Sequence, residues 1–189
     1  MLIVVATVPA ALAGIPFEDV IERQLRSPAF VASWSAWWAI LMGIADRQAS
    51  RPRPGAADPL LRVTWLQGFG IGLAQAIALI PGTSRSGVTI TAGLIGGLDR
   101  STAAQFAFLL GIPITAGAAG IKTLDLVRDG AMGADVGVLI AAFAGAAVSG
   151  WLAVWFLVNY LRQRSLLPFV FYRLALVAVI LSLIGVERR

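Results

Sequence analysis

Long apolar runs separated by short charged segments dominate the sequence. Each run is near the length that an α-helix needs to cross about 30 Å of hydrocarbon. We therefore predict five membrane spans, at residues 2–16, 28–45, 101–121, 136–159 and 169–186.

The segment 64–98 has a different pattern. Residues 64–80 are apolar and helical in character, Pro81 and Gly82 stop the helix, and a polar stretch follows before a second apolar run at 88–98. Eleven residues at about 1.5 Å rise are too short to span a bilayer. Irregular backbone survives at membrane depth only when it is buried in protein or lines a cavity. We predict a re-entrant helix–loop–helix hairpin that returns to the side from which it entered.

The composition also predicts a membrane protein. The 189 residues are 58% hydrophobic and 13% charged, with a mean hydropathy of +0.83, whereas about 25% of the residues of a soluble domain are charged. A soluble globular protein is excluded. We expect residues 1–189 to form a single all-α integral membrane domain, a bundle of about five spans plus the hairpin.

The net charge of +5 predicts orientation rather than nucleic-acid binding, because the basic residues lie mostly between the apolar runs. With a re-entrant hairpin, seven arginines gather on one side, which the positive-inside rule makes cytoplasmic. The other loops mix both signs of charge and fall on the opposite side. The seven are Arg47, Arg51, Arg53, Arg62, Arg100, Arg162 and Arg164.

The stretch Pro81–Thr89 (PGTSRSGVT) carries the chemistry. It offers four hydroxyls, one guanidinium and two glycines, and leads into a short helix. Amides at a helix N-terminus and a bidentate arginine are what a phosphate needs. An arginine at membrane depth also requires an anionic or carbonyl partner. The alternative is that Ser84 and Thr89 only cap the helix 88–98, while Arg85 extends to the membrane interface.

Other polar and small residues have plainer explanations. Gln105 could face the site, but we expect it to bond a neighbouring helix instead. We expect Arg173 to reach the basic interface, with a phosphate contact left open. We expect Ser101 or Thr102 to cap the next span. Small residues at helical spacing indicate close packing of a tight bundle: Gly68 and Gly72, Gly93 and Gly97, and the row Ala142, Ala146 and Gly150.

Residues 75–89, Gln-Ala-Ile-Ala-Leu-Ile-Pro-Gly-Thr-Ser-Arg-Ser-Gly-Val-Thr, closely resemble the second signature motif of the undecaprenyl-diphosphate phosphatase family of the bacitracin-resistance type. Further similarity lies upstream, in TVPAA from Thr7 and in FED from Phe17. More lies downstream, in AAQFAFLLGIP from Ala103.

The resemblance implies a membrane enzyme that converts undecaprenyl diphosphate to undecaprenyl phosphate, the lipid carrier of peptidoglycan synthesis. It implies inverted repeats and an active site on the extracytoplasmic side of the bacterial inner membrane. A divalent cation, Mg²⁺ or Ca²⁺, is expected, with carboxylate ligands outside this chain. Carried over by position, the catalytic residues are Ser84, Arg85 and Thr89, and the diphosphate-binding residues are Gln75, Gly82, Thr83, Ser86 and Gly87.

The family's first motif, in which paired glutamates lead into a Ser/His loop, has no counterpart here, and the chain contains no histidine. It contains no cysteine either, so disulfides and thiolate metal sites are excluded. The pair Glu18 and Glu22 shares a helix face but lies in a charged stretch with no Ser/His loop after it, so we reject it as catalytic. Gln75 stands about where a glutamate is expected. We therefore expect an N-terminally incomplete form with little hydrolysis alone, its oligomeric state left open. The alternative function is a transporter or flippase of a phosphorylated lipid.

Overall fold

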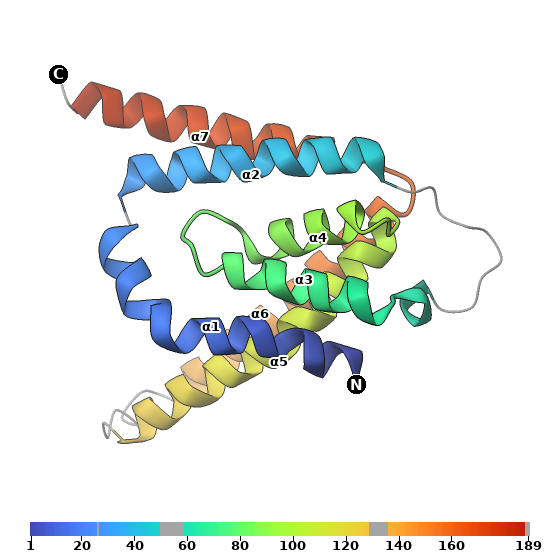
Figure 1. The fold of residues 1–189 in the computed structure, drawn as a ribbon. Coiled ribbons are helices and arrows are strands. Elements are labelled where there is room, and N and C mark those ends of the chain that lie inside the picture. The colour runs from blue at the N-terminus through green and yellow to red at the C-terminus, as the bar shows by residue number, and fades with distance from the viewer. Residues whose placement is uncertain (26, 50–58, 129–135, 188–189) are drawn as a thin grey trace.

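The computed structural model describes residues 1–25, 27–49, 59–128 and 136–187. In this part of the chain the regular structure is helical, as the fold class predicts (Figure 1). The elements are α1 (Leu2–Gln24), α2 (Pro28–Gln48), the 3₁₀ helix η1 (Pro59–Arg62), α3 (Trp65–Ile77), α4 (Arg85–Ile95), α5 (Arg100–Arg128), α6 (Val136–Leu161) and α7 (Leu167–Glu187).

Four stretches among the described residues are long and apolar enough to cross a membrane: Pro28–Gln48, Arg100–Asp125, Gly137–Leu161 and Leu167–Val186. The fifth expected span, 2–16, lies within the helix α1, and its apolar part among the residues with described side chains is Leu2–Ala13. It begins α1, which continues through the charged segment that was expected to be a loop. Glu, Arg and Gln are good helix formers, so the helix does not end where the charges begin.

The predicted helix–loop–helix is confirmed, and its re-entry into the membrane stays a prediction. Helices α3 and α4 pack against each other, with α3 also on α1 and α4 also on α2 and α5. The hairpin thus lies between α1 and the α2–α7 pair (Figure 1). At its base, Gln67 Nε2 donates to the carbonyl oxygen of Gly96 at 2.7 Å, so the two ends return to one side.

The bounds of the hairpin helices differ from the prediction of 64–80 and 88–98. Helix α3 begins after Thr64, whose side chain forms a capping box with Gln67. Helix α4 begins three residues early because Ser84 caps it, and it ends before Gly96. A capping hydroxyl satisfies orphan amides, and that local bond decides where a helix starts.

The charge pattern also predicted which loops lie together. Asp46, at the end of α2, binds Arg100 at the start of α5 through Nε at 2.5 Å. Gly43 lies against Val170 near the start of α7. The hairpin base, the end of α2 and the starts of α5 and α7 therefore share one end, which carries Arg47, Arg62, Arg100, Arg162 and Arg164. Arg51 and Arg53 lie outside the described residues.

The corner before α5 is capped by a different residue from those predicted. The Thr102 amide donates to Asp99 Oδ1 at 3.1 Å, so Asp99 caps the helix rather than Ser101 or Thr102. The positive end of the helix dipole also stabilises a carboxylate at this position.

Small residues bring some helices close together but not others. A Cβ at Gly72 would lie 2.1 Å from the carbonyl oxygen of Ala6, and one at Gly93 would lie 3.0 Å from Ala103 Cβ. These contacts confirm tight packing of α3 on α1 and of α4 on α5. The row ending at Gly150 does not pack in this way: a Cβ there would have nothing within 4 Å, and a Cβ at Gly97 would also meet open space.

Helix α6 packs against α5, and none of its most apolar stretch is buried within the described structure. Exposed apolar surface on this scale is not tolerated in water. The helix therefore presents an apolar surface suited to lipid or to further protein.

Candidate functional site

The hairpin loop, residues 78–84, has a backbone that ordinary residues rarely adopt. Gly82 has φ 90° and Ser84, which is not glycine, has φ 62°. A Cβ at Gly82 would also lie 2.5 Å from the carbonyl oxygen of Val31 on α2. A serine in this region costs about 1–3 kcal/mol and persists only when its surroundings hold it.

One anchor of the hairpin loop comes from α2. Trp34 Nε1 donates to Thr83 Oγ1 at 2.8 Å. That hydroxyl in turn donates to the carbonyl oxygen of Ile80 at 2.7 Å. Thr83 is fully buried. Its side chain thus holds the turn together, and its predicted contact with the diphosphate stays a prediction.

A second anchor comes from α7. Arg173 NH2 donates to the carbonyl oxygen of Gly82 at 2.9 Å and to Ser35 Oγ at 3.0 Å, with Thr83 O at 3.5 Å. The expectation that Arg173 reaches the basic interface is therefore wrong. A guanidinium inside a span is stabilised by carbonyl partners, and the hairpin loop supplies them.

The N-terminus of α4 completes the loop. Ser84 Oγ accepts from the Gly87 amide at 3.3 Å. The amides of Arg85 and Ser86 precede the helical ladder, have no partner among the described residues, and give this end a partial positive charge. Gly87 has no side chain here because a Cβ would lie 2.9 Å from Arg173 NH1. Free amides and Arg173 thus meet at one point.

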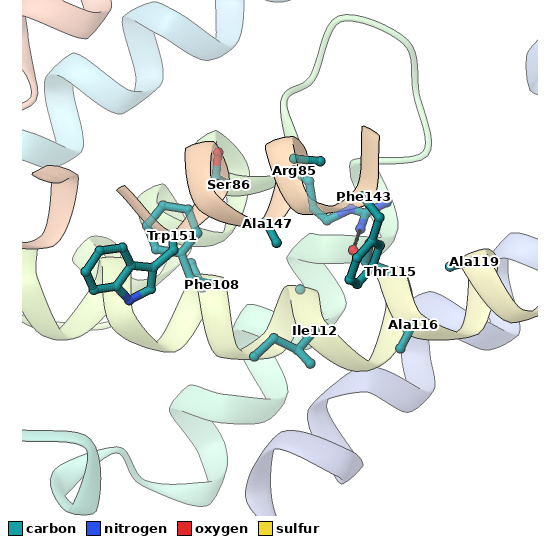
Figure 2. Close-up of a pocket in the computed structure, with 14 residues that line it drawn as sticks. Arg85, Ser86, Phe108, Ile112, Thr115, Ala116, Ala119, Phe143, Ala147 and Trp151 are labelled. Atoms are coloured by element: carbon teal, nitrogen blue, oxygen red, sulfur yellow. Dashed lines mark hydrogen bonds between the residues drawn. The ribbon is translucent and has the colours of Figure 1, made fainter. Parts of the chain in front are cut away.

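Arg85 points away from the loop anchors, into a groove between α5 and α6 (Figure 2). Its NH1 donates to Thr115 Oγ1 at 3.1 Å, so it does not extend to the interface as the alternative held. Thr115 lies in the middle part of the span Arg100–Asp125. The guanidinium therefore lies beside the middle of a stretch that is long and apolar enough to cross a membrane, exposed to the groove and without a carboxylate partner among the described residues.

Two other predicted site residues are buried. The Thr89 hydroxyl donates back into α4, to the carbonyl oxygens of Arg85 at 2.8 Å and Ser86 at 3.2 Å. Gln75, on α3, is 2% exposed, and neither polar atom of its amide has a hydrogen-bond partner among the described residues. The structure thus brings Ser84, Arg85 and Ser86 together at the accessible N-terminus of α4, whereas Thr89 and Gln75 are buried. Gln105 bonds Ser101 of its own helix at 3.1 Å, rather than a neighbouring helix.

No set of residues at the loop suits a metal. Among the described side chains, no group of three or more acidic residues comes together. Asp46 binds Arg100, and Asp99 caps α5. The side chains of Glu18 and Glu22 lie outside the described residues. A divalent cation therefore has no fitting ligands in this part of the chain.

Comparison with known proteins identifies the family. The model of the bacitracin resistance protein BacA family matches residues 1–179. The chain is a member of the BacA family. The resemblance of its loop motif is thereby confirmed.

Curated relatives agree with this assignment. An undecaprenyl-diphosphatase 2 from Stutzerimonas stutzeri (strain A1501) is 43% identical over 188 residues, which are 96% of this chain and 66% of the relative. An undecaprenyl-diphosphatase from Thioalkalivibrio sulfidiphilus (strain HL-EbGR7) is 42% identical, over 94% of this chain and 65% of its own. An undecaprenyl-diphosphatase from Elusimicrobium minutum (strain Pei191) is 42% identical, over 95% of this chain and 66% of its own length. The chain thus spans slightly less than two thirds of the length of these relatives.

Sequence reasoning missed the residues that hold the site. For Arg173 a signal existed, because a lone charge inside an apolar span is a functional-site candidate by default. Trp34 is one of three tryptophans in the predicted span 28–45, and Thr115 is one small polar residue in a long apolar run, so neither stands out in the sequence. Their separation from the motif, 49 and 30 residues respectively, hides such contacts from local patterns.

Proposed function

We propose that this chain binds the diphosphate group of undecaprenyl diphosphate and serves in removing its terminal phosphate. The observation that supports this most is the hairpin loop, a motif of the BacA family, with free amides and Arg85 at membrane depth. Relatives named undecaprenyl-diphosphatase favour hydrolysis over the transporter alternative. Chemistry at membrane depth suits a substrate whose phosphates are attached to a lipid.

In this proposal the groups at the loop bind and polarise the phosphates. The amides of Arg85 and Ser86 and the dipole of α4 attract the anion, as helix N-termini do in other phosphate sites. The Arg85 guanidinium bonds phosphoryl oxygens and stabilises the charge that develops as the bond to the leaving undecaprenyl phosphate breaks. Either a water attacks the terminal phosphorus directly, or the hydroxyl of Ser84 or Ser86 attacks it and a water then hydrolyses the resulting phosphoserine. Both routes release undecaprenyl phosphate and inorganic phosphate.

The expected divalent cation would neutralise phosphate charge. Its carboxylate ligands must come from elsewhere, because the described residues place none at the loop. This is why binding, rather than hydrolysis, is the first measurement for the 189-residue chain.

We further propose that the site opens to the extracytoplasmic side of the bacterial inner membrane. The hairpin loop contacts Val31 and Trp34, in the half of α2 that lies away from the arginine-rich end. If that end is cytoplasmic, as the positive-inside rule predicts, the loop opens toward the other face.

Pyrophosphate binding tests the proposal. The full chain in nanodiscs is titrated with pyrophosphate by isothermal calorimetry, with Arg85→Ala as the variant and Arg164→Ala, at the basic end, as the control. Loss of a hydrogen bond from a charged donor, at about 1.5–3 kcal/mol, should weaken binding about 10- to 150-fold. The Arg85→Lys variant should recover part of this, since it keeps charge without the bidentate fork.

Hydrolysis of undecaprenyl diphosphate is then measured through the release of inorganic phosphate. Pyrophosphate affinity that is unchanged in Arg85→Ala would refute the proposed role of the loop. Intact hydrolysis in Arg85→Ala with impaired lipid translocation would favour the transporter instead.

A further inference from the structure

The wall of the groove that faces Arg85 is almost entirely apolar. Helices α5 and α6 line it with alanine, glycine, isoleucine, phenylalanine and tryptophan, and with one threonine, Thr115. Of these side chains only the Thr115 hydroxyl can accept a hydrogen bond, because the indole N–H of a tryptophan is a donor. The wall therefore offers the Arg85 guanidinium a single side-chain acceptor.

Arg85 uses this acceptor. Its NH1 donates to Thr115 Oγ1 at 3.1 Å, and the two residues are 30 positions apart in the sequence. Figure 2 shows the Arg85 side chain extended from the start of α4 toward Thr115 on α5. Gly111, Thr115 and Ala119 follow each other at the four-residue spacing of one helix face, and all three line the groove. The position of Thr115 on α5 thus turns its side chain toward α4.

The bond that Thr115 makes also differs from those of other threonines in the helices. A threonine inside a helix often donates to the carbonyl oxygen one turn back. Such bonds, at 2.7–2.8 Å, are made by Thr7, Thr89, Thr91 and Thr123. The bond that the structure gives Thr115 is instead the one that it accepts from Arg85. This hydroxyl therefore serves a side chain of another helix.

The bond restrains the guanidinium without using it up. A guanidinium carries five N–H donors in one plane, and Thr115 takes one of them. Holding NH1 fixes the direction of the plane and leaves the edge with Nε and NH2, which matches two oxygens of a phosphate. Neither Nε nor NH2 of Arg85 has a hydrogen-bond partner among the described residues.

We infer that Thr115 is a positioning residue for the phosphate site, whose hydroxyl holds Arg85 in the groove with its second edge free for the ligand. This inference rests on the proposed function and adds to it a residue that lies outside the loop motif. A long side chain that is already ordered loses less freedom when the ligand binds, so the affinity rises. Without Thr115, the guanidinium samples directions that do not reach the phosphate.

A set of threonine variants isolates the hydroxyl. Thr115→Val removes the acceptor and keeps the shape of the side chain, and Thr115 is exposed, so the fold should be unaffected, as thermal unfolding will check. Thr115→Ser returns the hydroxyl. The matched control is Thr123→Val, on the same helix but outside the groove lining, where the hydroxyl bonds the carbonyl oxygen of Ala119 at 2.8 Å. Thr115→Ala repeats the test if valine disturbs the groove.

The first measurement is calorimetric titration of pyrophosphate into the full chain in phosphatidylcholine nanodiscs. Thr115→Val should weaken binding about 2- to 12-fold, which is the effect of ordering one long side chain on binding. Thr115→Ser should recover most of the affinity, and Thr123→Val should bind like the unchanged chain. In an Arg85→Ala background, Thr115→Val should change nothing, because its effect acts through Arg85. Equal weakening in both backgrounds would show a general structural effect and overturn the inference.

The second measurement needs no ligand. In the chain labelled with ¹⁵N-arginine, a guanidinium that is held by a hydrogen bond rotates slowly, so its two Nη resonances separate. The Arg85 signals are assigned by their loss in Arg85→Ala. They should merge in Thr115→Val and stay separate in Thr123→Val. Resonances that are already merged in the unchanged chain would overturn the inference.

The outcomes separate this inference from the proposed function. If Arg85→Ala weakens pyrophosphate binding but Thr115→Val does not, the positioning role fails and the proposed function stands. Tighter binding by Thr115→Val would also overturn the role, since Thr115 would then compete with the ligand for Arg85. If the unchanged chain binds no pyrophosphate, the proposed function fails, while Nη resonances that merge in Thr115→Val would still show that Thr115 holds Arg85.

Discussion

Replacing Arg173 by leucine should loosen the hairpin loop and weaken phosphate binding without touching the residues that face the groove. Arg173 reaches from α7 to the carbonyl oxygen of Gly82 at 2.9 Å and to Ser35 Oγ at 3.0 Å. Leucine fills part of the same space but donates nothing, so the carbonyl is left in an apolar setting without its partner.

The magnitude follows from these contacts. A hydrogen bond from a charged donor contributes about 1.5–3 kcal/mol. Losing two of them exceeds the strain of about 1–3 kcal/mol that Ser84 stores at φ 62°. Ser84 should then relax, and restoring it on ligand binding should lower pyrophosphate affinity by about 5- to 150-fold.

The assay is calorimetric titration of pyrophosphate into the full chain in nanodiscs, with hydrogen exchange of the loop amides as an independent readout. Arg164→Leu, which removes an exposed arginine at the basic end, is the matched control. Arg173→Lys should fall between the two, because an ammonium keeps the charge but loses the planar fork. Unchanged affinity and unchanged loop exchange in Arg173→Leu would show that the loop holds its shape without α7.

Two predictions concern packing, both measured by thermal unfolding in detergent. Gly72→Ala should destabilise the fold by about 1–3 kcal/mol, because its Cβ would lie 2.1 Å from the backbone oxygen of Ala6, whereas Gly70→Ala meets nothing within 4 Å and should be nearly neutral. Equal melting of these two variants would contradict the close contact of α3 with α1. Asp46→Asn should lower the free energy of unfolding by roughly 3 kcal/mol, because it removes the buried carboxylate that pairs with Arg100. If Asp46→Asn unfolded at the same temperature as the unchanged chain, the Asp46–Arg100 pair would contribute nothing to stability.

The hairpin could be predicted because its causes are local. An apolar run too short to cross, a Pro-Gly stop and a polar motif stand next to each other in the sequence, and backbone hydrogen bonding in lipid excludes most other arrangements. The bounds of α4 were less accurate. They depend on Ser84 acting as an N-cap with φ 62°, a conformation that a serine adopts only when the rest of the structure holds it.

The roles of individual polar residues were harder to predict. The motif supplies several hydroxyls of similar chemistry, yet Thr83 is fully buried and bonded to Trp34, while Ser84 is exposed. Sequence spacing does not tell which hydroxyl faces inward. Likewise, packing of α7 on α2 decides that Arg173 meets the loop instead of the membrane interface.

The sequence by itself determined that the chain is a helical membrane protein, because its hydrophobic runs are long. It also determined the hairpin, through local stop signals, and the family and the loop with phosphate-binding groups, through a contiguous motif. Only the tertiary structure decided which groups of that loop remain free, what holds it from α2 and α7, and that Arg85 opens onto an apolar groove between α5 and α6. The physical reason is distance along the chain. These contacts join residues 30 to 91 positions apart, and they form only when whole helices pack.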